Sequence, residues 1–383
     1  MEKFDVIIVG AGASGTMCAL SVKNNKKIAL VDSATFPAKK LLVTGNGRCN
    51  ITNTNISSLR YNQDVSGYMA KFSSADTLSF FENIGLLFNY EEEGRVYPYS
   101  NSARSVTDVI YNTLKSKNIY PFTEQTVESI KQINNSYCVK TQDYELYADK
   151  LVIATGGNTA QNVCKNFDIK TKPFVPSLCA LKTNPTKRLS GIRLSNVSVS
   201  ASCNGQTKTQ KGEVLFKDSG LSGIVVFNLS TLFARNNNFS GKITIDIMPE
   251  ITKESLFFLI KQRLSINCAV KDLFVGVFHN EIAKEIIWRS KINPEKNTNM
   301  LFDEEIKLLC DIIKNFDFDV KGYYENNQVY SGGVLLEELT QNLEAKNQPN
   351  LYFCGEVCDV DGECGGYNLQ WAWTSGHIVG ENL

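Results

Sequence analysis

The alternation of apolar and polar positions at the start of the chain predicts one strand, turn, helix, strand unit. Residues 4–9 form a short β-branched run, and residues 16–22 contain good helix formers. A turn rich in glycine, residues 10–15, stands between them, and a second apolar run over residues 27–31 ends at Asp32. Units of this kind build a parallel sheet covered by helices, so the pattern predicts an α/β fold.

The same periodicities continue up to about residue 155 and return at the end of the chain. Helical spacing predicts helices over about residues 75–86 and 103–115, and alternation predicts a hairpin of residues 137–141 and 144–147. Apolar runs at residues 150–155 and 350–354 each end in glycine, which is typical of buried strands of one sheet.

The middle of the chain has a different pattern. Short alternating runs make residues 178–250 rich in predicted strands, and residues 251–325 are predicted to be mainly helical. We therefore expect a discontinuous nucleotide-binding domain of residues 1–177 and 326–383, interrupted by an inserted domain of residues 178–325.

Composition narrows the class of protein. The 383 residues include 43% hydrophobic ones, which is enough for two globular domains, and 40 basic residues balance 40 acidic ones. This balance gives no overall positive field for a nucleic acid or an anionic membrane, so neither partner is expected. Eleven cysteines without any Cys-x-x-Cys pair, and a start without a signal sequence, favour a cytoplasmic protein with reduced thiols.

The glycine-rich turn has the spacing of a dinucleotide-binding site. In Gly10-x-Gly12-x-x-Gly15, the first glycine allows the tight turn, the second lets the backbone approach a pyrophosphate, and the third lets helix and strand pack closely. The following helix offers free N–H groups and a partial positive charge to the diphosphate. Asp32 can accept hydrogen bonds from an adenosine ribose.

Later segments favour FAD over NAD as the cofactor. Ala154-Thr155-Gly156-Gly157 and Phe353-Cys354-Gly355-Glu356 both end strands of the predicted sheet, where an extended FAD would pass. A helix that begins at about Asn368 can direct its positive end to the pyrimidine edge of the flavin. A second turn of the Gly-x-Gly-x-x-Gly type is not found in the sequence, so NAD(P)H is expected, if at all, as a transient electron donor.

Two long motifs resemble a known family. Residues 40–53, Lys-Leu-Leu-Val-Thr-Gly-Asn-Gly-Arg-Cys-Asn-Ile-Thr-Asn, and residues 355–372, which contain Gly-Gly-Tyr-Asn-Leu-Gln-Trp-Ala, are similar to the BaiN-like family of NAD(P)/FAD-dependent oxidoreductases, also described as aminoacetone oxidase flavoproteins. The resemblance implies a Rossmann-type FAD domain of the glutathione-reductase type with an inserted β-barrel and helices, and it implies that residues of the 40–50 segment lie close to the flavin.

The motifs and the resemblance together define an expected cofactor site, and we expect no metal site. The expected FAD-binding residues are Gly10, Gly12, Ala13, Ser14, Gly15, Asp32, Lys40, Thr44, Arg48, Cys49, Asn50, Val127, Thr155, Gly156, Gly157, Gly355, Glu356, Gly366, Asn368, Leu369 and Gln370.

The catalytic residue stays open at this point, with Arg48, Lys217 and Tyr367 as candidates. Arg48 stands between glycines and either contacts flavin or substrate or forms a structural ion pair. Lys217 and Asp218 replace a Thr-His pair that is common in the family, and the loop after Gly157 is shorter than in relatives. Cys49 is expected to be a small buried thiol beside the cofactor rather than a redox partner.

The sequence thus predicts an FAD-dependent oxidoreductase that transfers hydride through flavin N5. The expected reaction is NAD(P)H-linked reduction of a small or steroid-like carbonyl or enone. An amine oxidase and a flavin-bound redox-sensing interaction protein are the alternatives. The oligomeric state cannot be inferred from the sequence.

Overall fold

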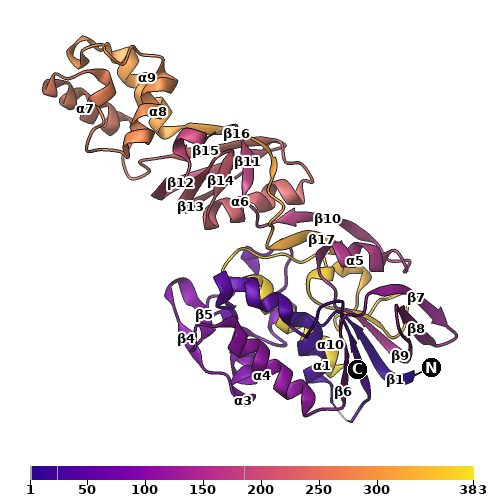
Figure 1. Cartoon of the computed structure of the whole chain (residues 1–383). Helices are drawn as coiled ribbons and strands as arrows, with labels where there is room; N and C mark the ends of the chain where they lie inside the picture. The colour runs from indigo at the N-terminus through magenta and orange to yellow at the C-terminus, as the bar shows by residue number, and fades with distance from the viewer. Residues whose placement is uncertain (1, 24, 185) are drawn as a thin grey trace. The chain divides into compact units, whose positions relative to one another are not determined.

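The computed structural model describes every residue except 1, 24 and 185, and the chain divides into two units. The sheet unit comprises Met1–Pro176 and Gln328–Leu383, and the inserted unit comprises Ser177–Asn327. Each unit has its own hydrophobic core. The expected fold class, a Rossmann-type domain interrupted by a barrel and helices, is confirmed (Figure 1).

The sheet unit is built on a seven-stranded sheet in the order β6-β2-β1-β9-β8-β7, with β18 paired to β9. The pairs among β6, β2, β1, β9 and β18 are parallel, whereas β9, β8 and β7 form an antiparallel extension. The strands are β1 (Glu2–Val9), β2 (Ile28–Val31), β6 (Ile119–Phe122), β7 (Val127–Ile133), β8 (Ser136–Thr141), β9 (Glu145–Ile153) and β18 (Leu351–Phe353).

Helices cover this sheet because they bury apolar faces against the hydrophobic core of the unit. In α4, Val106, Ile110 and Leu114 are buried at helical spacing. Helices α1 and α10 pack closely against each other, and Gly376 and Gly380 of α10 make this approach possible. The helices of the unit are α1 (Ala13–Ser21), α2 (Ser66–Met69), α3 (Ser74–Asn83), α4 (Ala103–Lys115), α5 (Gly157–Cys164) and α10 (Tyr367–Glu381).

The sheet unit also contains two small sheets and short helical turns, two of which lie beside the predicted motifs. The elements are β3 (Thr52–Asn53), β4 (Phe88–Tyr90), β5 (Arg95–Pro98), β10 (Thr171–Ser177), β17 (Val329–Val334), η1 (Lys39–Gly47) and η9 (Gly355–Val357). Strand β5 pairs with β3 and β4, and β10 pairs with β17. No helix of the described residues has the length and apolarity to cross a membrane.

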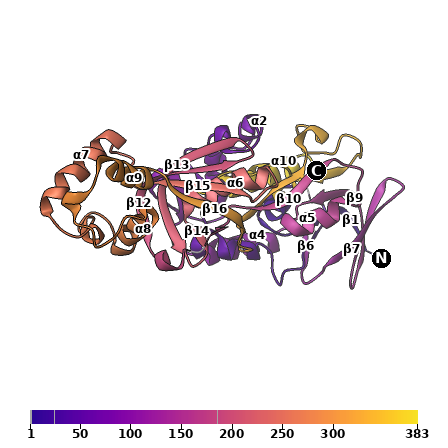
Figure 2. The ribbon, with the colours of Figure 1, turned by 90° about the horizontal axis from the view of Figure 1, so that it is seen from above.

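The inserted unit contains a closed barrel in the order β11-β14-β13-β12-β15-β16, and its helices α7 to α9 gather at one end of the unit (Figure 2). The strands are β11 (Leu181–Thr183), β12 (Arg193–Cys203), β13 (Gln206–Lys217), β14 (Gly220–Ser222), β15 (Gly241–Asp246) and β16 (Phe316–Tyr323). The helices are α6 (Ile224–Arg235), α7 (Lys253–Arg263), α8 (Asn280–Ser290) and α9 (Asp303–Lys314).

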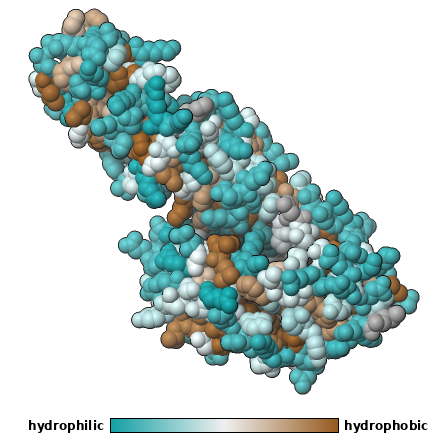
Figure 3. Space-filling model, in the orientation of Figure 1, coloured by the Kyte–Doolittle hydropathy of each residue, from teal (hydrophilic) through white to brown (hydrophobic). Residues whose placement is uncertain are grey.

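Three elements depart from the expected pattern. Helix α6 lies within residues 178–250, which were expected to be rich in strands, and β16 lies within residues 251–325, which were expected to be mainly helical. Helix α5 follows Gly156, where no helix was expected. Brown apolar surface is visible at the helical end of the inserted unit, at the upper left of Figure 3. Exposed large hydrophobic residues of this unit include Phe258, Trp288 and Phe302.

Candidate FAD site

Four neighbouring parallel strands end at the same edge of the sheet, and the predicted motifs follow their carboxyl ends. Gly10 follows β1, Asp32 follows β2, Ala154 follows β9 and Cys354 follows β18. Backbone hydrogen bonds join these ends: Gly10 N–H donates to Val31 O at 2.8 Å. Since ligands of open α/β sheets bind at this edge, the motifs are brought together where a nucleotide cofactor is expected.

The three glycines of the first turn have different surroundings. A Cβ on Gly10, whose φ is +104°, would lie 2.6 Å from Ala154 O, and a Cβ on Gly15 would overlap Gly10 O. Both positions therefore serve close packing of the turn against the strands. A Cβ on Gly12 would meet nothing within 4 Å, so Gly12 faces open space.

The helix after this turn has a free amino-terminal end. Gly12 caps α1 without a side-chain hydrogen bond, and the first turn holds no acidic residue. Ala13 is the first helical residue, and Ser14, which is buried, packs against Gly355. The N–H groups at this end are available to an anionic group above Gly12.

Asp32 ties the first turn to the end of β2. Its Oδ2 accepts from Ala11 N–H at 2.6 Å and its Oδ1 accepts from Ala34 N–H at 2.7 Å. Each carboxylate oxygen keeps a second lone pair for a ligand hydroxyl. Asp32 O accepts from Gln125 N–H at 2.9 Å, which brings the start of β7 and Val127 toward this edge.

Glu356 joins three segments of the edge. Its Oε2 accepts from Lys40 Nζ at 3.1 Å, and its Oε1 accepts from Tyr330 N–H at 2.8 Å. A Cβ on Gly156 would overlap Glu356 Oε2, and a Cβ on Gly157 would overlap the ring of Tyr330. Tyr330 was not predicted, and no motif in the sequence marks it.

The segment from Thr44 to Asn50 forms a tight coil with an unusual backbone. Gly45, Asn46, Gly47 and Cys49 all have positive φ values, of 55°, 56°, 80° and 60°. Thr44 O accepts from Cys49 N–H at 3.0 Å and closes the coil. Burial raises the pKa of the Cys49 thiol to about 12, although Thr44 opposes this shift, so the thiol stays protonated near neutral pH.

Arg48 forms an ion pair, which was one of the two alternatives. Its Nη1 lies 2.6 Å from Glu91 Oε1, and its guanidinium carbon lies 3.9 Å from the ring centre of Tyr97. The side chain of Arg48 stays 37% exposed, so N–H groups are left for a ligand. Glu91 was not predicted, because it stands 43 positions away in the sequence.

Asn50 and Gly366 fix the loop before α10. The Asn50 carboxamide donates to Val96 O at 3.1 Å and to Thr52 O at 2.9 Å, and it accepts from Gly366 N–H at 3.1 Å. Gly366 has a φ of +101°, and a Cβ there would lie 2.5 Å from Thr52 C. Asn50 thus positions this loop through hydrogen bonds within the protein.

Side chains of the first turn of α10 have partners within the protein, so contact of Asn368, Leu369 and Gln370 with FAD stays a prediction. Asn368 Nδ2 donates to Gly362 O at 2.9 Å, and its Oδ1 accepts from Gly362 N–H at 2.9 Å. Gln370 is fully buried, donates to Thr77 Oγ1 at 2.9 Å and accepts from Thr52 Oγ1 at 2.5 Å. Leu369 packs against the core. These side chains hold the helix in place.

The backbone at the start of α10 keeps the expected role. Gly366 caps the helix without a side-chain hydrogen bond, and the first turn contains no acidic residue. The positive end of the helix dipole is therefore free to act on an anionic ring. Tyr367, the third catalytic candidate, is 1% exposed, and its hydroxyl donates to Asn55 O at 3.2 Å. Burial raises its pKa.

Lys217, the second catalytic candidate, and the two histidines of the chain have other surroundings. Lys217 lies in the inserted unit, at the end of β13. His279 caps α8, where its Nδ1 accepts from Glu281 N–H at 3.2 Å. His377 stacks on Phe72 with 3.9 Å between ring centres, and burial lowers its pKa. Both histidines therefore have structural partners.

The surroundings of the strand ends fit FAD. The space above Gly12 suits a diphosphate, and Asp32 and Glu356 offer carboxylate oxygens for ribose and ribityl hydroxyls. Thr155 Oγ1 is buried and has no hydrogen-bond partner among the described residues, which is costly unless a ligand supplies one. Lys40, Gly156 and Glu356 extend this surface toward the 44–50 coil.

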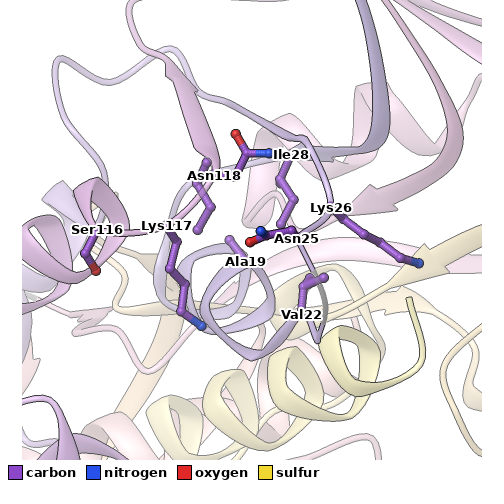
Figure 4. Close-up of a pocket in the computed structure, with 9 residues that line it drawn as sticks. Ala19, Val22, Asn25, Lys26, Ile28, Ser116, Lys117 and Asn118 are labelled. Atoms are coloured by element: carbon purple, nitrogen blue, oxygen red, sulfur yellow. The ribbon is translucent and has the colours of Figure 1, made fainter.

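A hollow of about 570 Å³ lies at the opposite edge of the sheet (Figure 4). Ile28 and Ile119 begin β2 and β6 there, and Ala19 and Val22 come from the end of α1. Lys117, which also lines it, donates from Nζ to Leu20 O at 2.5 Å. Because none of the predicted motif residues lines this hollow, it is separate from the candidate FAD site.

Comparisons with known proteins show the family of this chain. Residues 4–382 match the family model described as HI0933-like protein Rossmann domain. The 3-dehydro-bile acid delta(4,6)-reductase of Clostridium scindens is 27% identical, with 97% of each chain covered. The ribosomal RNA dihydrouridine synthase of Escherichia coli is 26% identical, with 100% of this chain and 98% of that protein covered.

Solved structures with a similar fold are more distant. The open conformation of a flavocytochrome c3 fumarate reductase has 15% sequence identity and a TM-score of 0.49, with 100% of this chain and 78% of that chain covered. Sdh1 of Mycobacterium smegmatis, in its apo complex, has 12% identity and a TM-score of 0.46, with 99% and 67% covered.

Proposed function

Because the chain belongs to the HI0933-like family and is an FAD-dependent oxidoreductase, we propose that it reduces a carbon–carbon double bond conjugated to a carbonyl, with NADH or NADPH as electron donor. Family membership confirms the resemblance read from residues 40–53 and 355–372. The proposed substrate is a small or steroid-like enone.

The names of the two full-length relatives carry this proposal. A delta(4,6)-reductase of a 3-dehydro-bile acid saturates carbon–carbon double bonds, and dihydrouridine differs from uridine by one saturated carbon–carbon bond. In both substrates the double bond is conjugated to a carbonyl. The shared chemistry is therefore addition of a hydride to the β-carbon and of a proton to the α-carbon.

The residues of the candidate site supply binding and electrostatics for this reaction. FAD, when bound, supplies hydride transfer at N5 of its isoalloxazine. The free end of α10 stabilises negative charge on a reduced ring. Arg48, which Glu91 and Tyr97 hold in place, can donate hydrogen bonds to the carbonyl oxygen, where negative charge develops.

Arg48 is a polarising group rather than a proton donor in this proposal. A guanidinium does not lose its proton in proteins, so the proton for the α-carbon comes from another group or from water. Cys49 is not a nucleophile here, since its pKa of about 12 keeps it protonated. Tyr367 is a poor acid because its hydroxyl is held by Asn55 O.

Anaerobic titration with NADH and then NADPH tests the electron donor. We expect one of them to bleach the visible flavin band of the purified protein without any other substrate. Nicotinamide and acceptor would then use the same flavin in turn, since the sequence contains one dinucleotide turn.

Two other results would contradict the proposal. Reduction by amines, with peroxide release in air and no response to either nicotinamide, would indicate the amine oxidase. A single slow reduction that no acceptor reverses, accompanied by altered hydrogen exchange in residues 178–325, would indicate the redox-sensing protein.

A further inference from the structure

Four residues form a row across neighbouring strands of the barrel in the inserted unit. Lys217 of β13 pairs with Gly220 of β14, Gly220 pairs with Lys182 of β11, and Lys182 pairs with Gly322 of β16. Directly paired residues of neighbouring strands project from the same face of a sheet. The two lysine side chains therefore rise from one face, with a glycine beside each of them.

This face is the outer face of the barrel. Leu181 and Phe216, which precede the two lysines, are fully buried, and successive residues of a strand point to opposite faces. Lys182 is exposed and Lys217 is half-buried. The row therefore faces away from the apolar interior of the barrel.

The ring of Tyr324 lies over this row. A Cβ on Gly220 would come within 2.9 Å of Tyr324 Cε2, so the ring takes the space that a side chain would fill. The ring centre lies 4.5 Å from Lys217 Nζ and 5.5 Å from Lys182 Nζ. Tyr324 N–H donates to Ala180 O at 2.9 Å, which fixes its backbone beside β11. We name Lys182, Lys217 and Tyr324 the lysine shelf.

The positive charges of the shelf are not neutralised by the protein. Among the described residues, no carboxylate oxygen lies within 4 Å of either ammonium. The nearby acids have other partners: Asp218 accepts from Ser190 Oγ at 2.5 Å, and Asp319 accepts from Asn184 Nδ2 at 2.9 Å. Elsewhere in the unit, lysines are paired, as Lys211 is with Glu250 at 2.7 Å.

Two like charges beside one ring repel each other, and an anion between them removes this cost. The ring holds both ammonium groups by cation–π attraction. Gly322 leaves room for a ligand beside Lys182, since a Cβ there would meet only Lys182 Cδ, at 3.8 Å.

We propose that the lysine shelf binds the anionic group, a carboxylate or a phosphate, of a small-molecule ligand. This proposal concerns the inserted unit alone and does not depend on the proposed function. Lys217, a catalytic candidate from the sequence, is thereby a binding residue.

Anion binding is measured by NMR on the full-length holoprotein after its lysines are labelled with ¹³C methyl groups by reductive methylation. This modification preserves the positive charge of the lysines. The methyl signals of Lys182 and Lys217, assigned with Lys182→Gln and Lys217→Gln, are followed while inorganic phosphate or acetate is added. We expect both signals to shift and to reach saturation. The anion that binds more tightly shows whether the natural ligand carries a phosphate or a carboxylate. Lys217→Met should weaken the binding seen at Lys182 by about threefold to tenfold.

Lys307→Met is the matched control, because Lys307 is an exposed lysine of α9 in the same unit. It should leave the binding unchanged, and Lys217→Gln repeats the test with a polar side chain. The proposal is wrong if neither signal responds to either anion, or if Lys307→Met weakens the binding as much as Lys217→Met does.

Discussion

Gly12→Val is expected to give a folded protein that is purified without FAD. A side chain at this position meets no protein atom within 4 Å of its Cβ, and the φ of −74° suits any residue. The protein itself therefore tolerates the change. The added methyl groups would occupy the space assigned to the diphosphate, and overpacking of this kind costs about 1–3 kcal/mol, or roughly 5- to 150-fold in affinity.

Gly67→Val is the matched control. Gly67 is exposed, its Cβ would also meet nothing within 4 Å, and it lies in α2 outside the predicted motifs. The flavin content is read from the visible spectrum, and folding is read from circular dichroism. A folded Gly12→Val protein with the flavin content of Gly67→Val would show that the diphosphate does not pass over Gly12.

Gly376→Ala is expected to lower the free energy of unfolding by about 2 kcal/mol. Helix α10 packs against α1 at this point, where a Cβ on Gly376 would overlap Ser14 O. One turn further, a Cβ on Gly380 would lie 2.5 Å from Cys18 O. In a helix, alanine is intrinsically more stable than glycine by about 1 kcal/mol. The measured loss of stability is therefore the cost of the clash minus this gain.

Urea unfolding of Gly376→Ala and Gly67→Ala measures this difference. Gly67→Ala should be neutral or slightly stabilising, since its Cβ has open space in a helix. If Gly376→Ala is as stable as the wild type, the close approach of α1 and α10 is not as the structure describes it. We also expect weaker FAD binding in this variant. The clash is with Ser14, which lies in the first turn of α1, the helix that begins directly after Gly12.

The dinucleotide turn could be predicted because it requires glycine at three fixed positions, where the backbone must turn tightly, approach a ligand or pack closely. Spacing alone assigned three roles to the glycines, and the structure gives Gly10 and Gly15 close backbone neighbours while Gly12 faces open space. Asp32 follows β2 as expected, and its carboxylate accepts a hydrogen bond from Ala11 N–H in the turn. Contact of these residues with FAD stays a prediction.

Side-chain direction could not be predicted for the residues after Gly366. Asn368 and Gln370 stand in a motif that marks the flavin region, but their amides satisfy Gly362, Thr52 and Thr77 inside the protein. A motif shows that a segment matters, and it does not distinguish residues that touch a ligand from residues that hold the segment in place.

Contacts between residues that are far apart in the sequence could not be predicted either. Glu91 reaches Arg48 from the loop between β4 and β5, and Tyr330 reaches Glu356 and Gly157 from β17. Helix α6 was missed because apolar residues lie on several sides of it, so that Val225, Val226 and Leu229 are all buried. A segment of this kind has no amphipathic period that separates a buried helix from a buried strand.

The oxidative half-reaction tests the central proposal most directly. The holoprotein is reduced anaerobically with a nicotinamide or dithionite and then mixed, without oxygen, with each of a series of small and steroid-like α,β-unsaturated ketones. We predict that one of these acceptors reoxidises the flavin and yields one equivalent of product saturated at the conjugated double bond. A flavin that stays reduced with every such acceptor, yet is reoxidised at once by oxygen with release of peroxide, would contradict the account.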